Sequence, residues 1–166
     1  MIITGKSWLF GDNINTDLIL PGRAQLFTEE EQKLCVFEAN RPGWLDEIDD
    51  GDIIIGGQNF GMGSSRPAAR SLRNIGLACL VAESINGLFF RNCVNWGFLA
   101  LECPGVSSAF EEGDVAEISF EGFTVKNART GEMLTAGAIP EQLLATMQAG
   151  GIFPVLEAEG LVAPAG

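Results

Sequence analysis

Apolar and polar residues along the middle of the chain follow an alternating pattern of short apolar runs and longer amphipathic stretches. The apolar runs predict buried strands at residues 52–57, 77–82 and 98–102. The stretches between them predict helices at residues 66–74 and 84–96, with a Ser84 cap on the second and a glycine just after each. Strands and helices that alternate at these lengths indicate βαβ units and a parallel sheet.

The two ends of the chain follow different patterns. A strand is expected at residues 1–10, and Thr28 followed by three glutamates predicts a capped helix running toward Asn40. Beyond residue 110, the pattern predicts two short strands and a closing helix, at residues 114–120, 122–127 and 140–149. Because no linker or repeat interrupts the sequence, residues 1–166 are expected to form one mixed α/β domain.

The charge balance narrows the range of partners. The formal net charge is −12, so a phosphate backbone would repel the surface, and nucleic acid is not expected as a partner. No polybasic segment, membrane-spanning run or signal-peptide h-region is present, which excludes a membrane location and makes the cytoplasm the expected compartment.

Cysteine and histidine usage restricts the chemistry. The four cysteines form no CxxC pair and the chain has no histidine, so no zinc or iron–sulfur site is expected from this chain alone. Cys79 lies in an apolar run and is expected in the core. Without histidine, acid–base chemistry must use an unusual group or be shared with another chain.

The segment with the most chemical information is the glycine-rich stretch at residues 57–67, between a predicted strand and a predicted helix. Parallel sheets bind ligands at this end of their strands, and the first amides of a helix favour an anion. Ser64, Ser65 and Arg66 would place two hydroxyls and a guanidinium there, and Arg66 is suited to holding a carboxylate. No Gly-Lys-Ser/Thr follows, which excludes a phosphate-binding Walker loop. A glycine-rich turn with a serine cap and a site for a small di- or tricarboxylate both remain open.

Several collinear blocks of the sequence resemble one known family. The stretch Asn59-Phe60-Gly61-x-Gly63-Ser64-Ser65-Arg66 is similar to the signature of the aconitase-type swivel domain, as found in small subunits of isopropylmalate dehydratases. The resemblance continues at residues 11–23, 82–84, 89–92, 113–114 and 143–151. It implies a single swivel-like α/β domain with β/β/α layers, a barrel-like mixed sheet and flanking helices.

The resemblance also implies a hydro-lyase divided between two subunits. A separate large subunit would carry a [4Fe–4S] cluster and act with this chain on a small hydroxy-dicarboxylate. Ser64 would be the base, removing a proton beside a carboxylate, while Ser65, Arg66 and Arg23 would bind the substrate. Because a free serine is a very weak base, this role requires amides, a helix N-terminus and a nearby cation in a closed site.

The sequence departs from the family pattern at two places. Pro67-Ala68-Ala69 stands where the family usually has Glu-His-Ala, and the substrate-facing loop reads Ala24-Gln25-Leu26-Phe27. Leu26 and Phe27 suit an apolar substituent and leave a distal carboxylate unpaired, although both could instead be core residues. Arg91 and Asn92 could support the site or lie on an exposed helix face.

Three functions follow from these features. The first is a subunit that dehydrates and isomerises 3-isopropylmalate in leucine biosynthesis. The second is a related subunit acting on dimethylmalate, another alkylmalate or homoaconitate. The third is a non-catalytic carboxylate-binding module that kept the fold.

Overall fold

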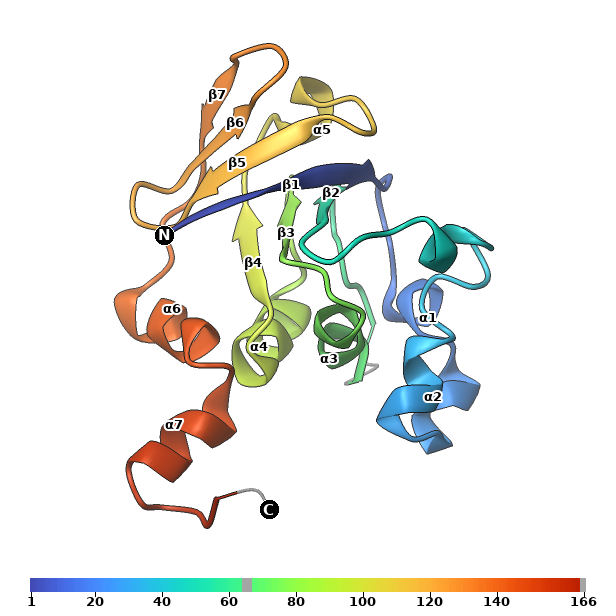
Figure 1. The fold of residues 1–166 in the computed structure, drawn as a ribbon, viewed down its shortest axis with the longest axis vertical. Helices are drawn as coiled ribbons and strands as arrows, with labels where there is room; N and C mark the ends of the chain where they lie inside the picture. The colour runs from blue at the N-terminus through green and yellow to red at the C-terminus, as the bar shows by residue number, and fades with distance from the viewer. Residues whose placement is uncertain (64–66, 165–166) are drawn as a thin grey trace.

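The computed structural model describes residues 1–63 and 67–164 (Figure 1). Within these residues the strands join into one curled sheet in the order β4-β3-β2-β1-β5-β6-β7. The strands are β1 (Ile2–Leu9), β2 (Ile53–Gly56), β3 (Cys79–Ala82), β4 (Leu99–Glu102), β5 (Val115–Ser119), β6 (Thr124–Asn127) and β7 (Met133–Thr135).

Strand β1 joins a parallel half of the sheet to an antiparallel half. Its last residues pair in parallel with β2, in the register Ser7 with Ile53, and β2, β3 and β4 continue in parallel. Its first residues pair with β5 in antiparallel register, Ile2 with Ser119, and β6 and β7 continue in antiparallel. The expected parallel βαβ units and the expected β-rich closing segment are both confirmed.

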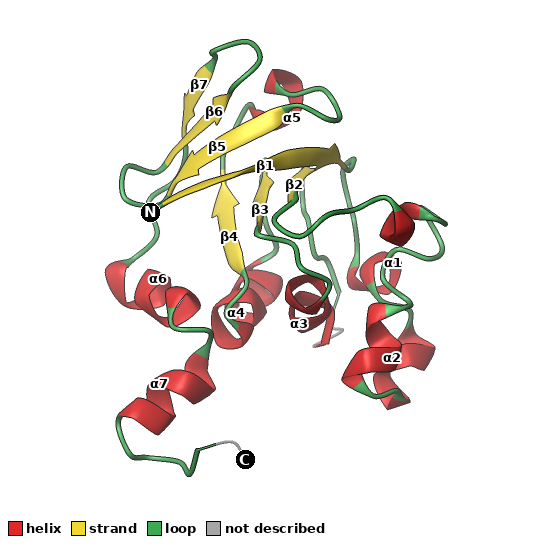
Figure 2. Cartoon of the chain, in the orientation of Figure 1, coloured by secondary structure: helices red, strands yellow, loops and turns green. Residues whose placement is uncertain are grey.

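Helices and 3-10 turns flank the sheet (Figure 2). They are α1 (Thr16–Ile19), η1 (Gly22–Leu26), α2 (Glu29–Lys33), η2 (Trp44–Asp46), α3 (Pro67–Asn74), α4 (Gly87–Trp96), α5 (Val106–Ala109), α6 (Glu141–Gln148) and α7 (Ile152–Ala158). None of the helices in the described part of the chain is long and apolar enough to cross a membrane.

Alternate residues of the parallel strands face two different cores. Ile54 and Leu80 join the core that contains Leu72 of α3 and Phe89 of α4. Their neighbours in sequence pack instead with the antiparallel half, in a core formed by Ile53, Ile55, Val81, Ile118 and Val125, among others. Because these strands are covered on both faces, they read as continuous apolar runs. The resulting order of antiparallel strands, parallel strands and helices confirms the expected β/β/α layers and flanking helices.

Some predicted boundaries were wrong. The capping box at Thr28 is present, but α2 ends at Lys33 and turns occupy the stretch toward Asn40. Helix α4 is capped by Asn86, whose side chain accepts the Leu88 amide, and the expected Ser84 cap is not used. Elements α5, α7 and β7 were missed because they span only four, seven and three residues.

Candidate functional site

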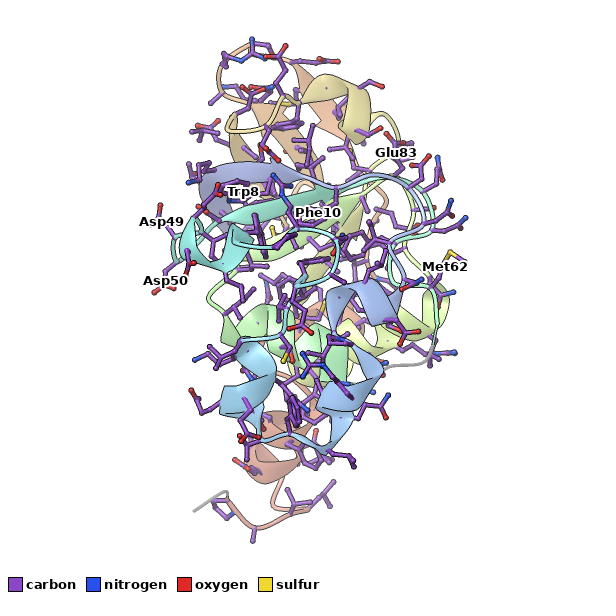
Figure 3. All side chains as sticks on the ribbon, turned by 90° about the vertical axis from the view of Figure 1, so that its right-hand side faces the viewer. Trp8, Phe10, Asp49, Asp50, Met62 and Glu83 are labelled. Carbon is purple, nitrogen blue, oxygen red and sulfur yellow. The ribbon has the colours of Figure 1, made fainter. Side chains whose placement is uncertain are left out.

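The glycine-rich loop leaves the carboxyl end of β2 and lies at one edge of the parallel strands. Figure 3 shows Met62 of this loop and Glu83, just after β3, on the same side of the molecule. Asp49 and Asp50, which precede β2, lie on the opposite side. The loop therefore occupies the edge at which parallel sheets place their ligand sites.

One side of the loop is held by the segment that follows β1. The Gln58 amide donates to the Asp12 carboxylate at 2.7 Å, and the Asn13 amide donates to the Gln58 carbonyl at 2.7 Å. Further along, the Thr16 amide donates to the Met62 carbonyl at 2.7 Å. These contacts bring together two of the sequence blocks on which the family resemblance rests.

The other side of the loop is held by the segment that follows β3. The Ser84 hydroxyl accepts a hydrogen bond from the Asn59 amide at 2.8 Å and donates to the Gln58 side chain at 2.9 Å. The Asn86 amide donates to the Phe60 carbonyl at 2.9 Å. Two segments that are distant in the sequence thus meet at one loop. Side chains that accept hydrogen bonds from the backbone amides of the loop hold this backbone in place, although it forms no regular strand.

Two glycines are required by these close approaches. A Cβ on Gly57 would lie 2.0 Å from Asp12 Oδ1, the atom that accepts the Gln58 amide. Gly61 has a φ of +84°, a conformation that other residues rarely adopt. Glycine at these two positions is therefore a packing requirement of the loop.

Ser64, Ser65 and Arg66, the expected base and carboxylate-binding residues, lie outside the described residues. The residues on either side are placed. Gly63 lies close to Thr16, and a Cβ on Gly63 would be 2.7 Å from Thr16 Oγ1. Pro67 is the first residue of α3, the position where its missing N–H removes no hydrogen bond. The three residues therefore connect the glycine-rich loop directly to the start of α3.

The expected substrate loop forms η1 and the residue after it. The Leu26 side chain is 94% exposed, so the alternative that it belongs to the core is wrong. Phe27 is partly buried and packs against the edge of the larger core. Arg23 forms an ion pair with Glu38, and its guanidinium lies 5.5 Å from the centre of the Phe27 ring. The loop thus presents an aliphatic side chain beside a cation that already has a carboxylate partner.

The ion pair gives Arg23 a fixed partner. The hydrogen bond to Glu38 and the attraction of its negative charge raise the pKa of the Arg23 guanidinium above its usual value. Arg23 is a permanent cation at the start of the loop, as arginine is at any physiological pH. Glu38, which the sequence did not single out, is the residue that holds it.

Glu83 organises the edge of the sheet beyond β3. Its carboxylate accepts the Gly105 amide at 2.8 Å, the Ser107 amide at 2.9 Å and the Ser107 hydroxyl at 2.6 Å. Burial alone would raise the pKa of Glu83, but these hydrogen bonds outweigh that effect and hold the pKa below its usual value. Glu83 is therefore an ionised anchor for the turn before α5, with its oxygens already occupied.

Arg91 and Asn92 were expected either to support the site or to lie on the helix surface. Arg91 is exposed on α4. Asn92 lines a pocket with Trp96 and Phe153, between α4 and α7. Among the described residues, neither has a recorded hydrogen bond to the glycine-rich loop.

No group of three histidine, cysteine, aspartate or glutamate residues among the described positions is arranged to hold a metal. The four cysteines are free and buried. Burial raises the pKa of Cys103 to about 11 and raises the pKa of Cys79 and Cys93 strongly. The thiols of Cys79, Cys93 and Cys103 therefore stay protonated near neutral pH in the chain alone.

Comparison with known proteins identifies the family. The family model described as the aconitase C-terminal domain matches residues 15–105, a range that includes the glycine-rich loop and the segment after β3 that holds it. The isopropylmalate/citramalate isomerase small subunit of Methanocaldococcus jannaschii is 41% identical over 158 residues, covering 94% of each chain. The chain belongs to the aconitase C-terminal domain family.

Other members of the aconitase C-terminal domain family match just as completely. The 3-isopropylmalate dehydratase small subunit 1 of Methanopyrus kandleri is 40% identical over 162 residues, covering 96% of this chain and 95% of that protein. A crystal structure of 3-isopropylmalate dehydratase from Methanocaldococcus jannaschii superimposes with a TM-score of 0.90 at 25% identity, covering 97% of this chain. The expected swivel-like fold is thereby confirmed.

Proposed function

We propose that this chain is the small subunit of a two-subunit hydro-lyase that converts 2-isopropylmalate and 3-isopropylmalate into each other in leucine biosynthesis. The observation that carries the proposal is the near-complete match to small subunits named for this reaction, at up to 41% identity among those compared. The geometry of the loop supports it, since residues 57–63, which precede Ser64, Ser65 and Arg66 in the sequence, lie at the ligand-binding edge of the sheet.

In this proposal, the residues of this chain bind and deprotonate the substrate. Ser64 removes the proton from the carbon beside a carboxylate, and the first amides of α3 together with Arg66 stabilise the serine alkoxide. Ser65 and Arg66 hold a carboxylate, for which the guanidinium provides two parallel donors. Arg23 adds a permanent cation at the start of the substrate loop.

The iron–sulfur cluster is proposed to lie on the large subunit. The described residues of this chain provide no cluster of metal ligands, and the four thiols are buried. When bound to the partner, the [4Fe–4S] cluster supplies a Lewis acid for the departing hydroxyl. The four free cysteines also support a reducing compartment, in keeping with the proposed cytoplasmic location.

The substrate loop favours an alkyl substituent over an additional carboxylate. Leu26 projects its aliphatic side chain into solvent, where it is available to a substrate, and the nearby Arg23 is already paired with Glu38. A smaller alkylmalate is the second candidate, because one relative is named for both isopropylmalate and citramalate. Homoaconitate fits less well, since the loop leaves its distal carboxylate without a free cation.

The decisive experiment is reconstitution of the two-subunit enzyme. The chain is co-expressed with a large subunit from the same source, the cluster is rebuilt without oxygen, and alkylmalates are screened by the absorbance of the enoate. We expect turnover of isopropylmalate by the complex and none by either subunit alone. A correctly assembled complex with full cluster iron and no activity on any alkylmalate would leave the non-catalytic binding module as the better interpretation.

A further inference from the structure

Gln32 is a buried polar residue that lies between the substrate loop and helix α3. It is on α2, and its side chain is 2% exposed. Its amide nitrogen donates to the Ala24 carbonyl at 3.0 Å, and its amide oxygen accepts from Arg70 Nη2 at 3.0 Å. Each end of the amide therefore meets a complementary partner on a different element.

On the side of the substrate loop, Gln32 binds a backbone atom, the carbonyl oxygen of Ala24. Ala24 is fully buried in the middle of η1, between Arg23 and Leu26. Because Gln32 binds the Ala24 carbonyl, it fixes the main chain that carries both of these side chains. The direction of Leu26 toward solvent then follows from the position of this backbone, while Arg23 is held in addition by its ion pair with Glu38.

The helix side of the bridge is Arg70, one turn after the start of α3. Its Nη1 forms an ion pair with Glu29 at 3.2 Å, and its guanidinium lies 4.9 Å from the centre of the Trp96 ring. Arg70 is thus fixed by an acidic group, an aromatic face and the Gln32 amide at once. Planar, multidentate contacts of this kind hold an arginine more rigidly than a single ion pair does.

We propose that Gln32 and Arg70 are positioning residues that hold the substrate loop at a set distance from α3, and that this distance sets the discrimination between large and small alkyl substituents. The inference rests on the proposed function, in which Ser64, three residues before α3 in the sequence, is the base and η1 meets the substituent. The Gln32 amide links these two parts through its hydrogen bonds to the Ala24 carbonyl and Arg70. Displacements of about 1 Å are enough to change the fit of reacting groups in an enzyme site.

The test measures a ratio of specificities in the reconstituted complex. The variants are Gln32→Met, Arg70→Met and the double variant, assayed with isopropylmalate and with the methyl-substituted malate. The ratio of the two kcat/KM values does not depend on the fraction of protein that is folded or loaded with cluster. A purely structural loss would therefore leave the ratio unchanged.

Arg73→Met provides the matched control on the same helix. Arg73 donates to the Trp96 and Gly150 carbonyls, so it ties α3 to the C-terminal part of the chain and has no recorded contact with η1. We expect it to lower thermal stability without changing the ratio. Gln32→Glu is a second variant with little change in volume: its carboxylate still accepts from Arg70 but cannot donate to the Ala24 carbonyl.

We expect the preference for isopropylmalate to fall by about fivefold or more in Gln32→Met, Gln32→Glu and Arg70→Met. A hydrophobic pocket discriminates between substrates that differ by one methylene group by about tenfold or more, so a displaced loop has a preference of this size to lose. The fall in preference in the double variant should be no larger than in the more severe single variant, because each single substitution already breaks the same bridge. Hydrogen exchange of the amides at residues 22–27 should rise in the same variants.

Unchanged ratios in an active complex would overturn the inference and leave the proposed function standing. A wild-type complex inactive on both malates would remove the proposed function, and this inference with it.

Discussion

Gly61 lies directly against the ring of Phe89, so close that a Cβ on Gly61 would be 2.2 Å from Phe89 Cγ. The contact joins the glycine-rich loop to the helix that follows β3, and Phe60 packs on the same ring with centroids 5.8 Å apart. The position of the loop is therefore set in part by the aromatic side chain of Phe89, which lies outside the loop on α4, and not by the loop sequence alone.

Replacing Gly61 with alanine should displace the loop. The substitution places a methyl group inside the Phe89 ring and forces a non-glycine residue to a φ of +84°. We expect a loss of about 2 kcal/mol or more in the free energy of unfolding and a large loss of activity in the complex. Urea denaturation and turnover measure the two effects. Gly11→Ala is the control, because a Cβ there meets nothing within 4 Å; equal losses in both variants would contradict this account.

Ser64→Ala should abolish turnover while folding and assembly remain intact. The chain has no histidine that could replace the base, so we expect kcat to fall by about a thousandfold. If the Ser64 hydroxyl caps α3, its loss costs about 1 kcal/mol, which a domain of ordinary stability tolerates. Steady-state kinetics measure kcat, gel filtration measures subunit assembly, and the melting temperature measures stability. Ser108→Ala, on the exposed surface of α5, serves as the control. Activity within a few-fold of wild type would remove Ser64 as the base.

Leu26→Arg should alter substrate preference without loss of stability. Because Leu26 is 94% exposed, the substitution disturbs no core packing. The added cation should weaken the use of an alkylmalate and improve the use of a substrate that has a further carboxylate. The control is Leu34→Arg, since Leu34 is 75% exposed at the end of α2 and is not part of the substrate loop. The same specificity profile in both variants would show that residue 26 does not contact the substrate.

Asp114 should give the antiparallel half of the sheet a stability that depends on pH. Arg129 Nε donates to its carboxylate at 2.6 Å, and the Glu111 amide and Asn127 side chain donate at 2.8 Å each. The hydrogen bonds from Arg129 and from the Glu111 amide lower the pKa of Asp114 well below its usual range. Because its pKa is lower in the folded state, the ionised Asp114 carboxylate stabilises the fold at pH values above its unfolded-state pKa, which is about 4. This stabilisation is lost progressively as the pH falls toward the folded-state pKa.

Asp114→Asn should therefore destabilise the protein at pH 7, and the difference from wild type should narrow as the pH falls below about 4. Urea denaturation across this range measures the difference, with the exposed Asp46→Asn as the control. A difference that stays constant down to pH 3 would mean that ionisation of Asp114 is not the source of the stabilisation.

The parallel half of the fold could be predicted from the sequence because its strands are buried on both faces. Ile53, Ile54 and Ile55 are all fully buried, so the run is apolar at every position. The cap of α4 was predicted two residues early, because Ser84 and Asn86 both have side chains that can cap a helix. The choice depends on Ser84 binding the Asn59 amide, a contact between distant segments.

The elements that were missed give little signal in one sequence. Strand β7 has three residues, none of them buried, and α7 has no buried residue and contains Pro154 in its first turn. The glycine-rich loop was singled out through its glycines and the collinear blocks, and the structure places residues 57–63 after the carboxyl end of β2. The roles of Asp12, Ser84 and Gln32 could not be predicted, since each depends on a partner in another segment that only the fold brings near.

The double pairing of β1 has a consequence for the order in which the molecule can form. Strand β1 is the central strand of the sheet, and Ile2 pairs with Ser119, which lies far along the chain from it. Until β5 is synthesised, one edge of β1 has its main-chain groups unpaired, and an unpaired edge is a template for association with other chains. The sheet can therefore be completed only after the antiparallel half has been synthesised, and until then this edge of β1 is open to association.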